Sequence, residues 1–165
     1  MSLQKELGLQ EPFKDIRHEA VLSIVRTANL LSTTATQLFR QYDLTEAQFN
    51  VLFSLKFAPG TVTQAELGKR LVVTRASITS VLDKLEAKDL VRRTDVPGNR
   101  RIHHVELTDA GTELIERVEP VYRDEVHLAL KDLSDGECAT LIDFLEKSRE
   151  RVGQMLSPEA KQRAI

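Results

Sequence analysis

Two nearby stretches of the sequence combine short hydroxyl side chains with Arg and Lys. The first is predicted to lie on one helix, at its start or on its outer face, and consists of Thr74, Arg75, Ala76, Ser77, Thr79, Ser80 and Lys84. The second is a turn-rich loop, residues 95–101, that ends in Arg100 and Arg101. Free amides and hydroxyl groups at a helix start suit phosphates and base edges, and Arg on a loop can reach into a groove. Both stretches therefore predict a surface that binds double-stranded DNA.

The charge of the chain is distributed unevenly, in a way that supports this prediction. The 165 residues together carry a formal net charge of -2. Residues 63–107, however, contain nine Lys or Arg and six Asp or Glu, so this segment carries +3. Because local charge sets the field that a phosphate backbone meets, this segment is the expected site of contact.

The sequence contains no pattern that is typical of an enzyme. It has no Gly-rich phosphate loop, no nucleophile elbow and no carboxylate pair beyond ordinary helical spacing. Its four His residues are scattered and lack the spacing of metal ligands, although His103 or His104 could face DNA or support the predicted hairpin. We therefore expect no catalysis, no cofactor and no metal.

The single cysteine, Cys138, cannot form a disulfide within the chain. It shares an apolar helical stripe with Leu141 and Leu145, which favours a buried structural thiol. A redox-sensing thiol is the alternative interpretation, which a thiol titration would test.

The polar stretch belongs to the second of two short predicted helices. A capping box at residues 63–66 begins the first helix, which ends near residue 70. Thr74 caps the second, residues 75–88, and only residues 71–74 separate the two. The apolar inner face of the second helix consists of Ile78, Val81, Leu82 and Leu85. This spacing is that of a helix-turn-helix.

A β-hairpin is predicted directly after these helices. Residues 90–94 and 102–107 alternate as strands do, and the loop of residues 95–101 joins them with its cationic end. A helix-turn-helix followed by such a hairpin is a winged helix, which places its second helix in the major groove and its wing near the minor groove. Phosphate contacts are the expected role of Lys84, Arg92 and Arg93.

Long amphipathic helices are predicted on both sides of this lobe. Residues 15–42 form one helix, and a capping box at residues 45–48 begins another that ends before Pro59. The apolar stripe of the long helix consists of Val21, Ile24, Ala28, Leu31, Ala35, Leu38 and Tyr42. These elements predict an amphipathic helical scaffold before the winged helix.

The C-terminal part is predicted to be helical as well. Thr108 begins a helix that reaches about residue 133, with a kink or a break at Pro120, and a capping box at residues 134–137 begins the last helix. Aromatic residues make up only 5%, so we expect an aliphatic core. No apolar run approaches the roughly 18 residues of a membrane span, so we expect a cytoplasmic protein without membrane contact. The fold class is mainly α with a small β-hairpin wing.

The run from Thr63 to Gly111 resembles the MarR family of bacterial regulators. It reads TQAELGKRLVVTRASITSVLDKLEAKDLVRR and, after residues 94–96, PGNRRIHHVELTDAG. Two positions depart from the family pattern. Asp89 stands where many members have Gly after the second helix of the helix-turn-helix. The wing is one residue longer than in the family pattern, with Asn99 in place of an Asp.

The resemblance implies a domain organisation and a function. A single MarR-like domain would cover residues 1–165, with a DNA-binding lobe at 44–111 and dimerisation helices at 15–43 and 112–156. Such a protein is a transcriptional regulator, in most cases a repressor. It would bind a pseudo-palindromic operator as a homodimer.

The resemblance also implies release from DNA by a small-molecule effector. Relatives bind aromatic or phenolic acids between the dimer helices and the lobe, and Arg17, His18 and Tyr42 are the candidate wall residues here. Two alternatives stay open: a redox- or metal-responsive variant of the same regulator, and a helical adaptor that does not bind DNA.

Overall fold

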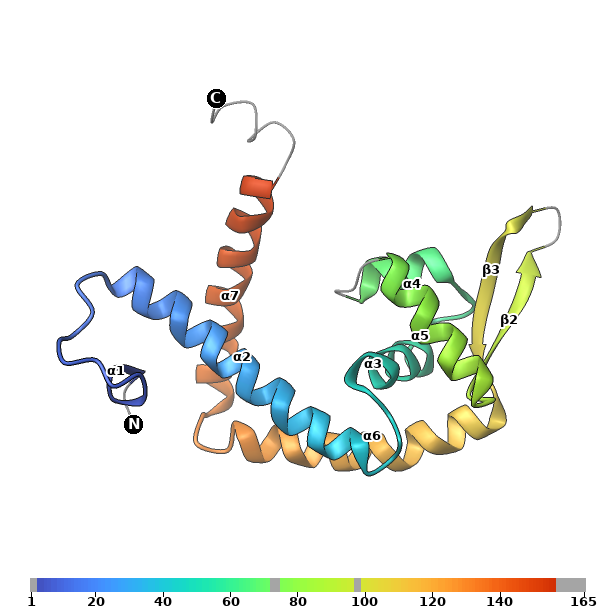
Figure 1. The fold of residues 1–165 in the computed structure, drawn as a ribbon, viewed down its shortest axis with the longest axis horizontal. Coiled ribbons are helices and arrows are strands. Elements are labelled where there is room, and N and C mark those ends of the chain that lie inside the picture. The colour runs from blue at the N-terminus through green and yellow to red at the C-terminus, as the bar shows by residue number, and fades with distance from the viewer. Residues whose placement is uncertain (1–2, 72–74, 97–98, 157–165) are drawn as a thin grey trace. The chain divides into compact units, whose positions relative to one another are not determined.

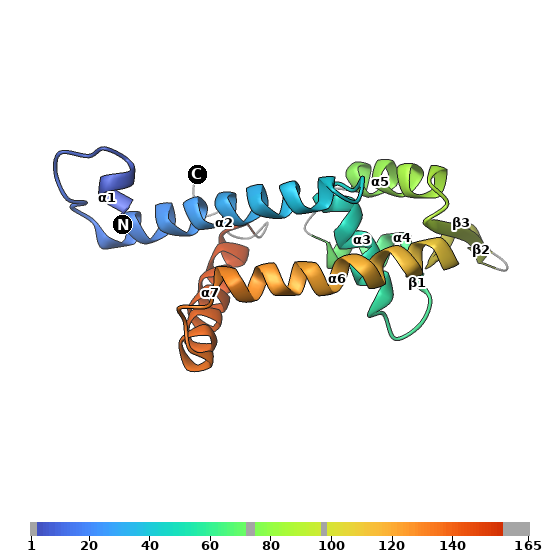
Figure 2. The same cartoon turned by 90° about the horizontal axis from the view of Figure 1, so that it is seen from below.

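The computed structural model describes residues 3–71, 75–96 and 99–156, but not the side chains of residues 75–77, 96 and 99–102. Its contacts divide the chain into two units, Met1–Asp124 and Glu125–Ile165. The first unit contains the three-stranded sheet and most of the helices (Figures 1 and 2).

Two helices precede the lobe. The short α1 (Leu3–Glu6) was not predicted, whereas α2 (Ile16–Arg40) confirms the predicted long helix. The side chain of Asp15 accepts a hydrogen bond from the backbone N–H of Arg17 at 2.9 Å and so caps α2. Only the last turns of α2 are buried, at Leu38 and Phe39.

Capping boxes begin the next two helices, as the sequence predicts. In α3 (Glu46–Lys56) the Thr45 hydroxyl accepts from the N–H of Gln48, whose side chain accepts from the N–H of Thr45. In α4 (Gln64–Arg70) Thr63 and Glu66 form the same pair of bonds. These reciprocal bonds satisfy amides that a helix start leaves free.

The helix-turn-helix and the wing are confirmed. Helix α5 (Arg75–Ala87) follows α4, and strands β2 (Val91–Val96) and β3 (Asn99–Leu107) form an antiparallel hairpin. A further strand that was not predicted, β1 (Val62–Thr63), pairs with β3, so the sheet order is β1-β3-β2. Figure 1 shows the hairpin extending beyond the helices of the lobe.

One hydrophobic core lies between the end of α2, helices α3 to α5, the sheet and the first part of α6. Most of its buried residues are Leu, Val and Ile, as predicted, but Phe39 and Phe49 stack at its centre with 4.1 Å between ring centroids. Tyr122 of α6 packs against both rings. The expectation of a purely aliphatic core was therefore wrong, because a few aromatic residues concentrate at one place.

Helix α6 (Asp109–Ala129) runs through Pro120 as one helix, so the predicted break does not occur. Val118 before the proline is buried and Tyr122 after it packs on the core, so both flanks are held in place. In the second unit, a capping box of Ser134 and Glu137 begins α7 (Asp135–Leu156), as predicted. None of the helices that the structure describes is long and apolar enough to cross a membrane.

Candidate nucleic-acid interface

The outer face of α5 presents the polar side chains that the sequence singled out. Thr79, Ser80 and Lys84 are exposed, while Ile78, Leu82 and Leu85 on the opposite side are at most 1% exposed. Burial of one face fixes which side chains the other face offers. Thr74 lies outside the described residues. Arg75, Ala76 and Ser77 form the first turn of α5, but their side chains are not described.

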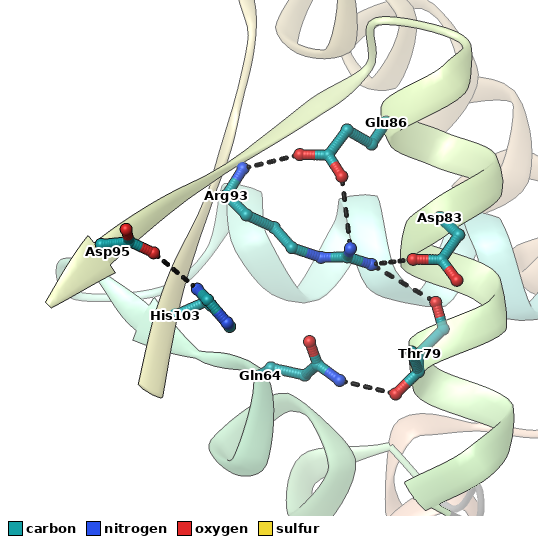
Figure 3. A network of polar contacts seen from close by, with 7 residues as sticks. All are labelled: Gln64, Thr79, Asp83, Glu86, Arg93, Asp95 and His103. Atoms are coloured by element: carbon teal, nitrogen blue, oxygen red, sulfur yellow. Dashed lines mark hydrogen bonds and ion pairs between the residues drawn. The ribbon is translucent and has the colours of Figure 1, made fainter. Parts of the chain in front are cut away.

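Helix α4 is tied directly to this outer face. The side-chain amide of Gln64 donates a hydrogen bond of 2.7 Å to the Thr79 hydroxyl (Figure 3). Gln64 is the first residue of α4, next to the capping residue Thr63. The capping bonds of Thr63 fix the start of α4, and they therefore also fix the position from which Gln64 bonds to Thr79.

Arg93 of β2 reaches across to α5 and binds two carboxylates there (Figure 3). Its guanidinium lies 2.6 Å from an oxygen of Asp83 and 3.2 Å from an oxygen of Glu86. It also donates to the backbone carbonyl of Thr79 at 3.4 Å. The Arg93 side chain is only 20% exposed. The wing and the second helix are thus joined by an ion-pair cluster that solvent screens only partly.

This arrangement corrects the predicted phosphate role of Arg93. A guanidinium that is held between Asp83 and Glu86 is not available for a phosphate. Arg92, its neighbour on β2, pairs with Glu106 of β3 at 2.8 Å but remains 64% exposed. The hydrogen bond between them lowers the pKa of Glu106 and raises that of Arg92. The sequence could not show these pairings, because the partners come from different elements.

The wing strands are longer than predicted. The antiparallel ladder continues to the pair Val96 and Asn99, so Arg100 and Arg101 lie in β3 rather than in a loop. Their side chains are not described. Below them, Nδ1 of His103 lies 3.0 Å from a carboxylate oxygen of Asp95 on the facing strand (Figure 3). The tip arginines therefore belong to β3, in the stretch between the pairs Asp95–His103 and Val96–Asn99 where the register is irregular.

The junction between α5, the wing and α6 explains why Thr108 and Gly111 stand three residues apart. Asp89 adopts φ 55°, a left-handed conformation that Asp tolerates in place of Gly. The Thr108 hydroxyl donates to the carbonyl of Asp89 at 2.5 Å and accepts from the N–H of Gly111 at 3.0 Å. A Cβ on Gly111 would lie 1.9 Å from the carbonyl oxygen of Leu90. Only glycine permits this approach of α6 to the start of the wing.

The end of α5 is also attached to the turn after α2. Lys88 donates to the carbonyl oxygen of Asp43 at 2.5 Å and to its carboxylate at 2.7 Å. Asp43 adopts φ 54°, and its backbone carbonyl and its carboxylate both accept from the same ammonium group. This contact connects the turn after α2 to the end of α5.

A cleft of about 830 Å³ lies between the end of α2, the start of α3, and helices α4 and α5. Apolar side chains such as Leu44, Val51 and Ile78 line it, together with Arg40 and Arg70. Apolar walls with two guanidinium groups and one carboxylate, that of Glu46, suit a small, mostly apolar ligand whose negative charge lies beside the arginines.

The residues predicted for the effector site are not brought together within one chain. Arg17 and His18 lie in the first turn of α2, and Tyr42 follows its last turn. A helix of 25 residues is roughly 37 Å long at about 1.5 Å per residue. His18 instead packs edge-on against Phe13, and Tyr42 packs on the core.

The comparisons with known proteins agree with this geometry. A model described as MarR family matches residues 42–102. The HTH-type transcriptional repressor NicR of Pseudomonas putida is 34% identical over 116 residues, 68% of this chain and 73% of NicR. The multiple antibiotic resistance protein MarR of Escherichia coli is 32% identical over 132 residues, 77% of this chain and 91% of that protein.

A solved structure supports the same assignment. Sco3205, a MarR family transcriptional regulator from Streptomyces coelicolor in complex with DNA, superimposes with a TM-score of 0.76 at 25% identity. The match covers 91% of this chain and 95% of that chain.

Proposed function

Because the chain belongs to the MarR family of DNA-binding transcriptional regulators, which are not enzymes, we propose that it is a homodimeric repressor of a pseudo-palindromic operator. It acts in the cytoplasm, and a small molecule releases it from DNA. The observation that carries the DNA contact is the outer face of α5, where Thr79, Ser80 and Lys84 are exposed above a buried apolar face.

The proposed contacts lie in two grooves of the DNA, the major groove for α5 and the flanking minor groove for the wing. The start of α5, with Arg75, Ala76 and Ser77, enters the major groove, as in other winged helices. Thr74 precedes this turn and would contact the adjacent phosphate. Arg100 and Arg101 extend the contact to the flanking minor groove, whose narrow form attracts Arg.

Exposed apolar side chains on the long helices support dimer formation. Helix α2 exposes Val21, Ile24 and Leu31 by 57%, 44% and 47%. In α7, Leu141 and Val152 lie on one face and are 41% and 53% exposed. Apolar residues that repeat along a helix at this exposure mark an association surface, and a second copy of the chain offers the same stripes.

The DNA proposal is tested by selecting binding sites from a random library with the purified protein and measuring affinity by fluorescence anisotropy. We expect an inverted repeat, with an affinity that falls steeply with salt. Lys84→Ala should weaken binding to all sequences and lower the salt slope by about 1, whereas Ser80→Ala should relax sequence preference. Lys147→Ala, in an exposed ion pair on α7, is the control. Equal affinity for selected and random DNA would refute the proposal.

For the effector, we propose a small aromatic or phenolic acid bound in the cleft that Arg40 and Arg70 line. The cleft adjoins both α2 and α5, so an occupant can alter how the DNA-facing helix sits on the scaffold. The probe is 4-hydroxybenzoate in isothermal titration calorimetry, with Arg40→Gln and Arg70→Gln as site variants. Loss of binding in these variants supports the cleft, and loss only in Arg17→Gln supports the start of α2. The absence of any binding contradicts this class of effector.

A further inference from the structure

Arg93 of β2 connects the wing to α5. Its guanidinium reaches Thr79, Asp83 and Glu86, which follow one another along a single stripe of α5 (Figure 3). Steps of four and three residues place these groups on neighbouring turns of one helix face. One side chain from the sheet therefore fixes two turns of the DNA-facing helix.

The contact involves the backbone of the wing as well as a side chain. The N–H of Arg93 donates to one oxygen of Glu86 at 3.1 Å, while its guanidinium lies 3.2 Å from the other oxygen. Glu86 thus holds both the position of the strand and the direction of the side chain. Within the described residues, Nε of Arg93 is buried and has no hydrogen-bond partner. The ion pairs must offset the cost of that burial, so the side chain is held in place by its terminal nitrogens.

We propose that Arg93 is a positioning residue for DNA recognition: it sets the distance and angle between α5 and the wing. The proposal rests on the proposed function, because it takes α5 and the wing as the two parts that contact DNA. The separation of α5 from the wing must match the separation of adjoining grooves for both to bind at once. Arg93 fixes that separation before DNA arrives, which reduces the entropy lost on binding.

The same contacts allow positioning to be distinguished from simple charge. Asp83 and Glu86 lie on the helix that carries Ser80 and Lys84, so their negative charge opposes a phosphate backbone. If charge alone mattered, Asp83→Ala with Glu86→Ala would strengthen binding to every DNA. If positioning matters, this double variant strengthens binding to random DNA but weakens binding to the selected site. The ratio of the two affinities should then fall at least about fivefold.

Arg92 provides a matched control for Arg93. Both residues lie next to each other on β2 and carry the same charge, but Arg92 pairs with Glu106 inside the wing. Arg93→Met should lower affinity for the selected site about tenfold, and Arg92→Met should lower it less and equally for all sequences. Hydroxyl-radical footprints of Arg93→Met should lose the flanking minor-groove protection. Methylation footprints should still show protection of guanine N7 by α5.

Thermal denaturation verifies that each variant is folded before DNA is added. If Arg93→Met does not fold, Arg93→Lys keeps the charge with a single contact and should retain an intermediate site preference. Equal footprints and equal affinity ratios in the Arg92 and Arg93 variants would overturn the proposal. That result differs from failure of the proposed function, in which the unaltered protein itself shows no preferred site.

Discussion

At the scale of single residues, Asp43 and Asp89 adopt positive φ where α2 and α5 have ended. Asp accepts this conformation at a lower cost than most residues with a Cβ. Asp89 therefore replaces the usual glycine without loss of the turn, and its carbonyl still accepts the Thr108 hydroxyl. The substitution changes the residue type but preserves the geometry.

Gly111 does not allow such a replacement. A Cβ there would lie 1.9 Å from the carbonyl oxygen of Leu90, which belongs to the backbone and has little room to move. We expect Gly111→Ala to lower the free energy of unfolding by about 3 kcal/mol or more, at the upper end of overpacking costs. Urea denaturation followed by circular dichroism measures this change.

Gly153 of α7 is the matched control, since in the described part of the chain no side chain or packing neighbour lies within 4 Å of the Cβ position there. Gly153→Ala should leave stability unchanged or raise it by up to about 1 kcal/mol through helix propensity. Similar losses in both variants would show that the approach of α6 to Leu90 is not the cause.

At the scale of elements, the start of α4 makes stability depend on pH. Hydrogen bonds from the backbone N–H and the hydroxyl of Thr63 lower the pKa of Glu66 below its ordinary value of 4.5. A carboxylate with a lowered pKa in the folded state stabilises it above that ordinary value, and the contribution is lost as the pH falls through the lowered pKa. We therefore expect Glu66→Gln to lower the melting temperature at pH 7, with a difference that narrows below about pH 4.5.

Glu113→Gln serves as the control, because Glu113 is an exposed carboxylate on α6. The melting temperature of Glu113→Gln should follow that of the unaltered protein across the same range of pH. A constant difference between Glu66→Gln and the unaltered protein at every pH would mean that the charge of Glu66 does not stabilise the cap.

Local chemistry made most elements predictable. The capping boxes at Thr45, Thr63 and Ser134 depend on residues three positions apart, so the sequence alone identified where α3, α4 and α7 begin. Strand β1 was missed because two residues are too short to show alternation, and its pairing with Val105 and His104 is set by the fold.

The candidate site was predictable only in part, because contacts between elements are set by the fold and not by the local sequence. Helical periodicity identified the exposed face with Thr79, Ser80 and Lys84. The contacts of Arg93 with Asp83 and Glu86, and the place of Arg100 in a strand, depend on how β2 lies against α5 and β3. The sequence alone could not distinguish Arg93 from Arg92. In the structure Arg93 faces α5, whereas Arg92 pairs with Glu106 within the wing.

At the scale of the whole molecule, we expect the proposed dimer to determine the affinity for DNA. Leu31 is 47% exposed on the apolar stripe of α2, so a carboxylate there would be buried in an interface between copies. We expect Leu31→Glu to shift sedimentation equilibrium toward the monomer and to weaken binding to the inverted repeat about a hundredfold, through the loss of simultaneous half-site contacts.

Thr33→Glu adds the same charge on the opposite side of α2, at an exposed position, and should leave both measurements unchanged. A dimer that persists in Leu31→Glu would place the interface elsewhere. Monomers that bind the whole repeat as tightly as the unaltered protein would contradict the need for two copies.

The register shift between Asp95 and Val96 has a consequence for how this regulator can diverge. The base of the hairpin pairs Val91 with Leu107 in regular register, while the irregularity lies near the tip. Within the described strands, residues 100–102 of β3 have no facing residue in β2, so the irregularity lies away from the core residues Val91 and Val105. We therefore expect mutations that lengthen the tip to cost little folding stability, so the proposed contact of the wing with flanking bases could diverge without compensating changes in the core.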